Sequence, residues 1–169
     1  KRASAIGVST AVTTAIGILD GLDSIHKLNL VHGDVSVRNI VVSNAGNPTL
    51  LSPCIWEAYS SSERAGVGLL PHMAPYLAPE VTRGGMPTPT SDVYAIGVLL
   101  FEMLTGGKPF PGKTAVDIAL LHATAEVPSI KGKVATAPEA LERILHKALA
   151  KDPLDRYRDA GAMAADMRL

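Results

Sequence analysis

The chain has 169 residues, of which 47% are apolar, and this is the size of one ordinary domain with a buried core. Its 16 basic and 16 acidic side chains give a formal net charge of zero, which argues against the strongly basic surface of nucleic-acid or anionic-membrane binders. The single cysteine, Cys54, excludes an internal disulfide and fits a reducing compartment. We therefore expect a cytoplasmic protein with no nucleic-acid partner.

The first predicted element is a helix over residues 9–27. Apolar residues at Val12, Ile16 and Leu19 recur at helical spacing. The basic pair at the start and the apolar residues after it imitate a signal peptide, but serines and threonines interrupt the apolar stretch. A buried amphipathic helix explains the pattern better. The other apolar run, residues 93–104, is shorter than the about 20 residues of a membrane span, so we expect no membrane contact within this chain.

Short β segments are predicted on both sides of a polar loop, at residues 30–31 and 40–42. Residues 44–48, rich in Asn, Gly and Pro, then form a turn signal before the apolar pair at 50–51. We expect a small hairpin there. Residues 52–83 show no sustained period and predict a long functional loop.

Only helices are predicted after residue 83, and each begins with a residue suited to a first helical turn. Gly106 and Gly107 end the first of them, and Thr114 with Asp117 forms a capping box for the second. The expected starting residues are Ser91 (to about Leu104), Thr114 (to about Thr124), Pro138 and Asp159. The fold class is therefore mainly α, in the α+β sense, with one small hairpin.

Residues 32–39, His-Gly-Asp-Val-Ser-Val-Arg-Asn, place an aspartate and an asparagine in one loop after an apolar segment. This run resembles the His-Arg-Asp…Asn catalytic loop of protein kinases. The resemblance implies that Asp34 accepts the substrate hydroxyl's proton and that Asn39 offers its amide oxygen to magnesium, a cation that prefers oxygen ligands. Arg38 would meet phosphate charge, because Ser36 replaces the usual lysine, and Val41 would form the floor of the adenine pocket.

Three later motifs occur in the family's order: residues 76–80 with Ala-Pro-Glu, residues 91–97, and residues 151–157. Four ordered motifs are far more specific than any one alone, and they resemble bacterial Ser/Thr kinases most. The resemblance covers only the C-terminal lobe, so we assign residues 1–169 to a kinase-like C-terminal lobe. The N-terminal lobe is expected to be absent from this chain, which has no glycine-rich loop before Asp34.

Four of the matching residues would be structural, by the same resemblance. His32 is expected in the core. Glu80 and Arg156 would form a buried ion pair between the second and fourth motifs. Asp92 would accept hydrogen bonds from the backbone of the loop that carries Asp34.

The departures from the family pattern occur at positions that bind metal or phosphate, or contact the catalytic aspartate, in the family. No aspartate lies between Asp34 and Asp92, and alignment puts Ser52, Pro53 and Cys54 where the magnesium-binding Asp-Phe-Gly should stand. A serine hydroxyl cannot supply the anionic oxygen that this site needs. Gly33 also replaces the arginine that receives an activation-loop phosphate, and Met73 replaces a threonine. The sequence therefore predicts no metal site.

The leading interpretation is a pseudokinase that acts as a protein-binding scaffold or regulator, with a protein partner or the missing N-terminal lobe bound to it. Asp34, Arg38 and Asn39 would then be residual, and no cofactor is required. The first alternative is a fragment of an active Ser/Thr kinase, which would use ATP and magnesium as part of a two-lobed protein, with Glu57 or Glu63 as an unusual metal ligand.

The second alternative is a P-loop nucleotide hydrolase. The stretch from Gly107 to Thr114 matches the expression Gly-x4-Gly-Lys-Thr. We expect an ordinary loop instead, because a helix is predicted before it and because Pro109 and Pro111 remove two backbone donors that a phosphate would need.

Overall fold

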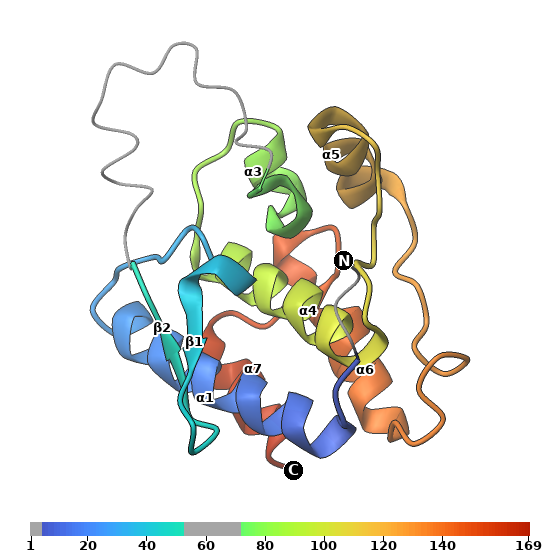
Figure 1. Cartoon of the computed structure of the whole chain (residues 1–169). Coiled ribbons are helices and arrows are strands. Elements are labelled where there is room, and N and C mark those ends of the chain that lie inside the picture. The colour runs from blue at the N-terminus through green and yellow to red at the C-terminus, as the bar shows by residue number, and fades with distance from the viewer. Residues whose placement is uncertain (1–4, 53–71) are drawn as a thin grey trace.

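The computed structural model describes residues 5–52 and 72–169. It is mostly helical, with one two-stranded antiparallel sheet, as the sequence predicts (Figure 1). The elements are α1 (Val8–His26), η1 (Val37–Asn39), β1 (Ile40–Val42), β2 (Pro48–Leu50), η2 (Ala74–Tyr76), α3 (Pro79–Thr82), α4 (Pro89–Thr105), α5 (Ala115–Thr124), α6 (Glu139–Ala148), η3 (Pro153–Asp155) and α7 (Ala160–Met167).

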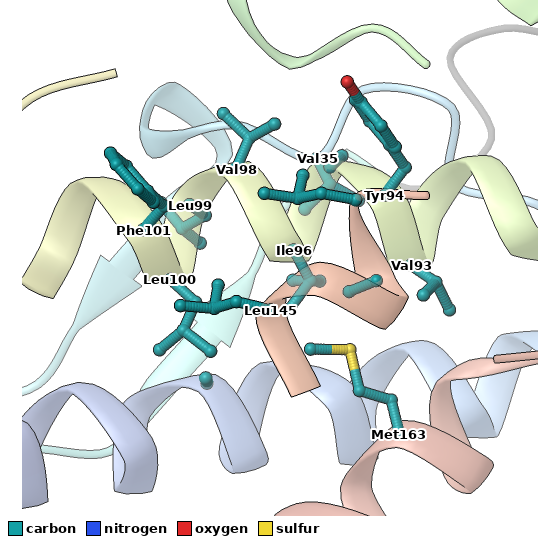
Figure 2. Close-up of a cluster of buried hydrophobic side chains, with 14 of the residues drawn as sticks. Val35, Val93, Tyr94, Ile96, Val98, Leu99, Leu100, Phe101, Leu145 and Met163 are labelled. Atoms are coloured by element: carbon teal, nitrogen blue, oxygen red, sulfur yellow. The ribbon is translucent and has the colours of Figure 1, made fainter. Parts of the chain in front are cut away.

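Helix α4 is the centre of the core. Residues 91–101 are all buried, and α4 contacts α1, α6, α7 and η2. A helix that is apolar on every side belongs in an interior. Figure 2 shows its side chains pointing both toward α1 and away from it, with Val35 from the neighbouring loop, Leu145 from α6 and Met163 from α7 packed among them.

The start of α4 differs from the expectation that Ser91 caps it. The helix begins at Pro89, and Thr88 is the N-cap. Ser91 lies one turn further in, where its hydroxyl accepts a hydrogen bond from the Thr88 backbone N–H at 3.1 Å. Proline fits the first helical position because it has no N–H to satisfy there. The predicted end is confirmed, since Gly106 adopts the left-handed conformation with φ 71°.

Two other predicted caps are confirmed. Thr114 and Asp117 form the capping box of α5, with the Thr114 N–H donating to Asp117 at 3.0 Å and the Asp117 N–H donating to Thr114 at 3.1 Å. Asp159 caps α7 by accepting from the Ala162 N–H at 2.7 Å. Pro138 is the N-cap residue of α6.

The predicted hairpin is present, and its second strand covers residues 48–50 where the apolar pair 50–51 was expected. Strand β1 pairs with β2 in the register Ile40 to Leu50 and Val42 to Pro48. Gly46 makes the turn with φ 83°. Residues 30–31, predicted as a β segment, form no strand, and the Leu30 N–H instead donates to the Ile25 carbonyl of α1 at 3.1 Å.

Helix α1 is long and apolar enough, by length and composition alone, to span a membrane. In the structure one of its faces packs against α4, α7 and β2, and the buried residues on it include Thr14 and His26 as well as Ile18 and Leu22. The helix predicted from the sequence is therefore present, and one of its faces is buried in the core.

Two glycines of α1 provide a matched test of how β2 is seated. A Cβ atom on Gly17 would lie 2.6 Å from Pro48 of β2, whereas a Cβ on Gly21 would meet nothing within 4 Å. Gly21→Ala should stabilise the fold by about 0.5–1 kcal/mol, the ordinary gain of alanine over glycine in a helix. Gly17→Ala should instead destabilise it by about 1 kcal/mol, because overpacking outweighs that gain. Urea denaturation checks both, and equal stabilisation by the two changes would contradict the close packing.

Candidate functional site

The loop of residues 32–39, here called the Asp34 loop, is tied to the core through Asp92 of α4. The buried Asp92 carboxylate accepts the backbone N–H of His32 at 2.8 Å and that of Gly33 at 2.9 Å. The expected role of Asp92 is thus present in the geometry. Gly33 has φ 77°, a conformation that glycine adopts without the penalty of about 1–2 kcal/mol that other residues carry.

His32 joins the Asp34 loop to the end of the hairpin. Its side chain is fully buried, as expected. The ring Nε2 lies 2.9 Å from the carbonyl oxygen of Leu51, and Nδ1 lies 3.2 Å from the backbone N–H of Asp34. These partners assign the proton to Nε2, which donates to Leu51, and leave Nδ1 to accept from Asp34.

Asp34 and Asn39 face each other across the loop. The Asn39 amide nitrogen donates to the backbone oxygen of Asp34 and to its carboxylate Oδ2, both at 2.8 Å. The other oxygen of each side chain accepts no hydrogen bond from the described residues. The pair thus offers one carboxylate oxygen able to take a proton and one amide oxygen able to face a cation.

Arg38 and Val41 are the two exposed members of the predicted site. Arg38 forms no ion pair within residues 5–52 and 72–169, and its side chain is exposed. Val41 lies in the middle of β1 and is 52% exposed. Arg38 is next to Asn39 in sequence, and Val41 lies two residues after Asn39, in the hairpin.

Ser52 follows directly on a residue that is fixed to the Asp34 loop. Leu51 donates its N–H to the Asn39 carbonyl at 2.7 Å and accepts from His32. Ser52 itself has φ 57°, a left-handed conformation in which Asp and Asn are several-fold enriched among non-glycine residues. Its side chain is a neutral hydroxyl, one residue after the backbone contacts of Leu51 with Asn39 and His32. Pro53, Cys54, Glu57 and Glu63 lie outside the described residues.

The donor set that the described residues supply near the Asp34 loop does not fit a resident magnesium ion. Magnesium is bound by hard oxygen ligands, usually one or two carboxylates together with phosphates. Here Asp34 already accepts from Asn39, and Ser52 brings no charge. In the described part of the chain, no three His, Cys, Asp or Glu side chains come together as a metal site.

Glu80 and Arg156 form the ion pair expected from the two motifs. Two parallel hydrogen bonds of 2.8 Å join the guanidinium to the carboxylate. The Arg156 side chain is fully buried and that of Glu80 keeps 21% exposure. Arg156 also donates to the carbonyls of Ala150 and Lys151. Partial burial raises the pKa of the Glu80 carboxyl, but hydrogen bonds from Arg156 and Ser91 outweigh it and leave the pKa below its usual value.

Met73 lies beneath the Asp34 loop, buried at 6% exposure. With Gly33, Asp34 and Tyr76 it lines a cavity of about 20 Å³, which has room for about one water molecule. The thioether of Met73 is at best a weak acceptor. It therefore cannot take over the hydrogen bond that the resemblance assigns to a threonine at this position.

Sequence reasoning missed the role of His26. Its Nε2 lies 3.0 Å from Asp92 Oδ2, and its Nδ1 accepts the backbone N–H of Ala160 at 3.3 Å. One buried ring thus connects α1, α4 and α7. Nothing in the sequence pattern identified these partners, which are 66 and 134 residues away.

The stretch from Gly107 to Thr114 connects two helices. It runs from the end of α4 to the start of α5, where the Thr114 side chain caps the helix and Lys113 is exposed. A phosphate-binding P-loop follows a strand. The structure therefore gives the nucleotide-hydrolase interpretation no support.

Comparison with known proteins agrees with the four motifs. Residues 1–166 match the protein kinase domain family. The chain belongs to this family.

Its relatives include bacterial Ser/Thr kinases. The chain is 40% identical over 151 residues to the serine/threonine-protein kinase PrkC of Bacillus subtilis. The aligned region covers 89% of this chain and 23% of PrkC. It is 38% identical over 150 residues to PknL of Mycobacterium tuberculosis, covering 89% of this chain and 38% of PknL. A probable kinase PknB of Lactococcus lactis is 38% identical over 157 residues, covering 93% and 25%. The chain thus spans between about a quarter and two fifths of the length of these kinases.

Arg156→Ala should destabilise the fold by about 3–5 kcal/mol, because it leaves the Glu80 carboxylate without its buried partner. Arg168→Ala is the matched control. Its guanidinium pairs with Asp20 at 2.6 Å, but the two side chains are 47% and 54% exposed, and such surface pairs contribute about 0–1 kcal/mol. Urea unfolding of both variants measures the difference. If they lose similar stability, the Glu80–Arg156 pair does not hold the motifs together.

The lowered pKa of Glu80 predicts an acid-dependent loss of stability. A carboxyl whose pKa is lower in the folded state stabilises the fold above its unfolded value near 4.5, and this contribution disappears as the pH falls through the folded pKa. Between pH 6 and pH 3, the free energy of unfolding should therefore decrease less for Glu80→Gln than for the parent. Glu139→Gln, in an exposed pair with Lys131, is the control and should follow the parent curve.

Proposed function

We propose that this chain is the C-terminal lobe of a bacterial-type Ser/Thr kinase domain that has lost phosphoryl transfer and works as a pseudokinase, a protein-binding scaffold or regulator. The observation that carries the proposal is Ser52. It directly follows Leu51, whose backbone is hydrogen-bonded to His32 and Asn39, and the resemblance aligns it with the aspartate that holds magnesium against the nucleotide phosphates in kinases.

Other departures support the same proposal. Gly33 has no side chain with which to bind a phosphorylated activation segment. Ser36 is fully buried and its hydroxyl has no hydrogen-bond partner among the described residues, so it cannot serve as the phosphate-binding cation two positions after Asp34. Each change removes a charged or polar contact to phosphate or substrate. None of them removes a buried apolar contact of the core.

The surface around the hairpin supports a binding role. Four apolar side chains in or beside it are 41–52% exposed: Val37, Val41, Val42 and Leu51. Clusters of exposed apolar residues tend to mark interfaces. The partner would be another protein or an N-terminal kinase lobe. Cytoplasmic location and the absence of nucleic-acid and membrane partners belong to the same proposal.

The alternative is that the chain is part of an active Ser/Thr kinase. The Asp34–Asn39 geometry favours it, because both side chains keep one oxygen free of the described donors and Arg38 is exposed next to them. ATP and magnesium would then bind in a two-lobed protein, with Glu57 or Glu63 providing the missing carboxylate. In that case Asp34 would accept the proton of the substrate hydroxyl.

Phosphoryl transfer separates the two candidates. With radiolabelled ATP and either magnesium or manganese, we expect the protein to transfer no phosphate to itself or to a general acceptor protein, because the metal lacks a carboxylate at Ser52. Asp34→Asn is the control for contaminating kinases. Transfer that is present in the parent and lost in Asp34→Asn would overturn the pseudokinase proposal in favour of the active kinase.

Ser52→Asp tests in a metal-binding experiment whether a carboxylate is missing at residue 52. The left-handed backbone at residue 52 suits aspartate, so the variant should fold. It should raise the affinity for manganese–ATP, measured by the electron paramagnetic resonance of the metal, by roughly tenfold for one added anionic ligand. Ser43→Asp, at an exposed turn serine, should leave it unchanged. Equal binding by the parent and Ser52→Asp would mean that no carboxylate is missing.

A further inference from the structure

A groove of about 710 Å³ lies where the C-terminal end of α1 meets the N-terminal end of α7, and we call it the α1–α7 groove. The two helices pack against each other (Figure 1). The charged residues that line the groove are Asp23 and Lys27 on the α1 side and Arg158 and Asp159 on the α7 side, and Pro89 at the start of α4 also lines it. None of these residues belongs to the Asp34 loop or to the exposed apolar surface around the hairpin.

The residues of α7 that line the groove are small: Gly161, Ala162 and Ala165. Small residues let a second polypeptide backbone approach closely. A Cβ atom on Gly161 would lie 2.9 Å from the carboxyl carbon of Asp23, so glycine at this position lets Asp23 lie against the first turn of α7. A carboxylate is favoured there, because the N-terminal end of a helix carries partial positive charge.

The two cations of the groove are much more exposed than its two carboxylates. The side chains of Lys27 and Arg158 are 73% and 87% exposed, whereas those of Asp23 and Asp159 are 23% and 29% exposed. A ligand that approaches from solvent therefore meets positive charge first, and the partial positive charge at the start of α7 has the same sign.

Arg158 is held in a way that leaves most of its donors available. Its Nε donates to Oδ2 of Asp159 at 3.0 Å, and the other carboxylate oxygen of Asp159 accepts the Ala162 N–H at 2.7 Å. The two terminal nitrogens of the guanidinium donate to none of the described residues. They form the planar fork that binds a carboxylate through two parallel hydrogen bonds.

Lys27 provides a second cation on the opposite side of the groove. Its ammonium pairs with Asp23 at 2.5 Å, and an ammonium has three donors. Because each cation is already paired with its own carboxylate, the groove has no concentrated charge for a compact dianion such as phosphate. Two separate carboxylates fit it better, one at each cation. The exposure of both cations also distinguishes the groove from small-molecule pockets, which enclose most of their ligand.

We propose that the α1–α7 groove is a docking site for an acidic segment of a partner polypeptide. One carboxylate of the segment binds the free fork of Arg158 and a second binds Lys27, while small residues between them lie over Gly161 and Ala162. This inference goes beyond the proposed function, because the groove shares no residue with the hairpin surface or with the Asp34 loop.

Peptide titrations followed by the backbone amide shifts of the protein test the docking site. The probe is a capped six-residue peptide of alternating glutamate and alanine, and the matched peptide carries glutamine in place of glutamate, which keeps the shape without the charge. The glutamate peptide should shift the amides of Lys27, Gly161 and Ala162 and should bind roughly tenfold more tightly than the glutamine peptide, because its hydrogen bonds to the two cations are charge-assisted.

Variants at the exposed cations identify the contacts. Arg158→Gln and Lys27→Gln should each weaken binding of the glutamate peptide by roughly tenfold. Arg158→Lys keeps the charge but removes the fork, so it should weaken binding by a similar factor. Arg168→Gln is the matched control. It removes an exposed arginine that follows α7 and pairs with Asp20, outside the groove, and it should leave the affinity unchanged.

Three results would overturn the proposal. The first is equal binding of the glutamate and glutamine peptides, or no shift of the groove amides at millimolar peptide. The second is unchanged affinity in Arg158→Gln and Lys27→Gln. The third is binding of N-acetyl-glutamate amide as tightly as the peptide, which would show a site for small carboxylates instead of a polypeptide. These titrations contain neither nucleotide nor metal, so their outcome is independent of the phosphoryl-transfer and metal-binding experiments.

Discussion

The buried carboxylate of Asp92 is the interaction on which the site depends. It lies inside the central helix α4 and accepts three hydrogen bonds, from two consecutive backbone N–H groups of the Asp34 loop and from the ring of His26. An ionised group in a core is tolerated only when its lone pairs are occupied in this way. Because α4 touches α1, α6 and α7, fixing the loop to α4 fixes it to the whole domain, and the same carboxylate draws α1 and α7 together through His26.

Much of this fold could be predicted from the sequence, because many of its signals are local. The capping box of α5, the cap of α7 by Asp159 and the left-handed Gly106 each depend on residues within a few positions of one another. The hairpin turn at Gly46 is equally local. The wrong start of α4 has the same origin: Thr88, Pro89 and Ser91 all suit a first turn, and only the backbone decides which of them is the cap.

Contacts between distant segments could not be predicted from the pattern of residues. The partner of Glu80 is 76 residues away, and it was found only because both residues stand in motifs of a known family. No motif pointed to the three contacts that the structure adds: His26 with Asp92, Gly17 with Pro48, and Lys108 with Tyr76. Each depends on how two elements pack, and neither periodicity nor capping carries that information. The unusual backbone of Ser52 was hidden for the same reason.

The residues that hold the domain together match the family pattern more closely than the residues at the proposed site of lost chemistry. Asp92, His32 and the Glu80–Arg156 pair make hydrogen bonds that join distant parts of the chain, while Gly33, Ser36 and Ser52 carry no charge. Removing one partner of a buried ion pair leaves the other charge unpaired and lowers the stability of the fold by several kcal/mol. Removing a phosphate-binding charge at the surface changes that stability very little. A kinase lobe released from catalysis but still needed as a folded surface would change in this order.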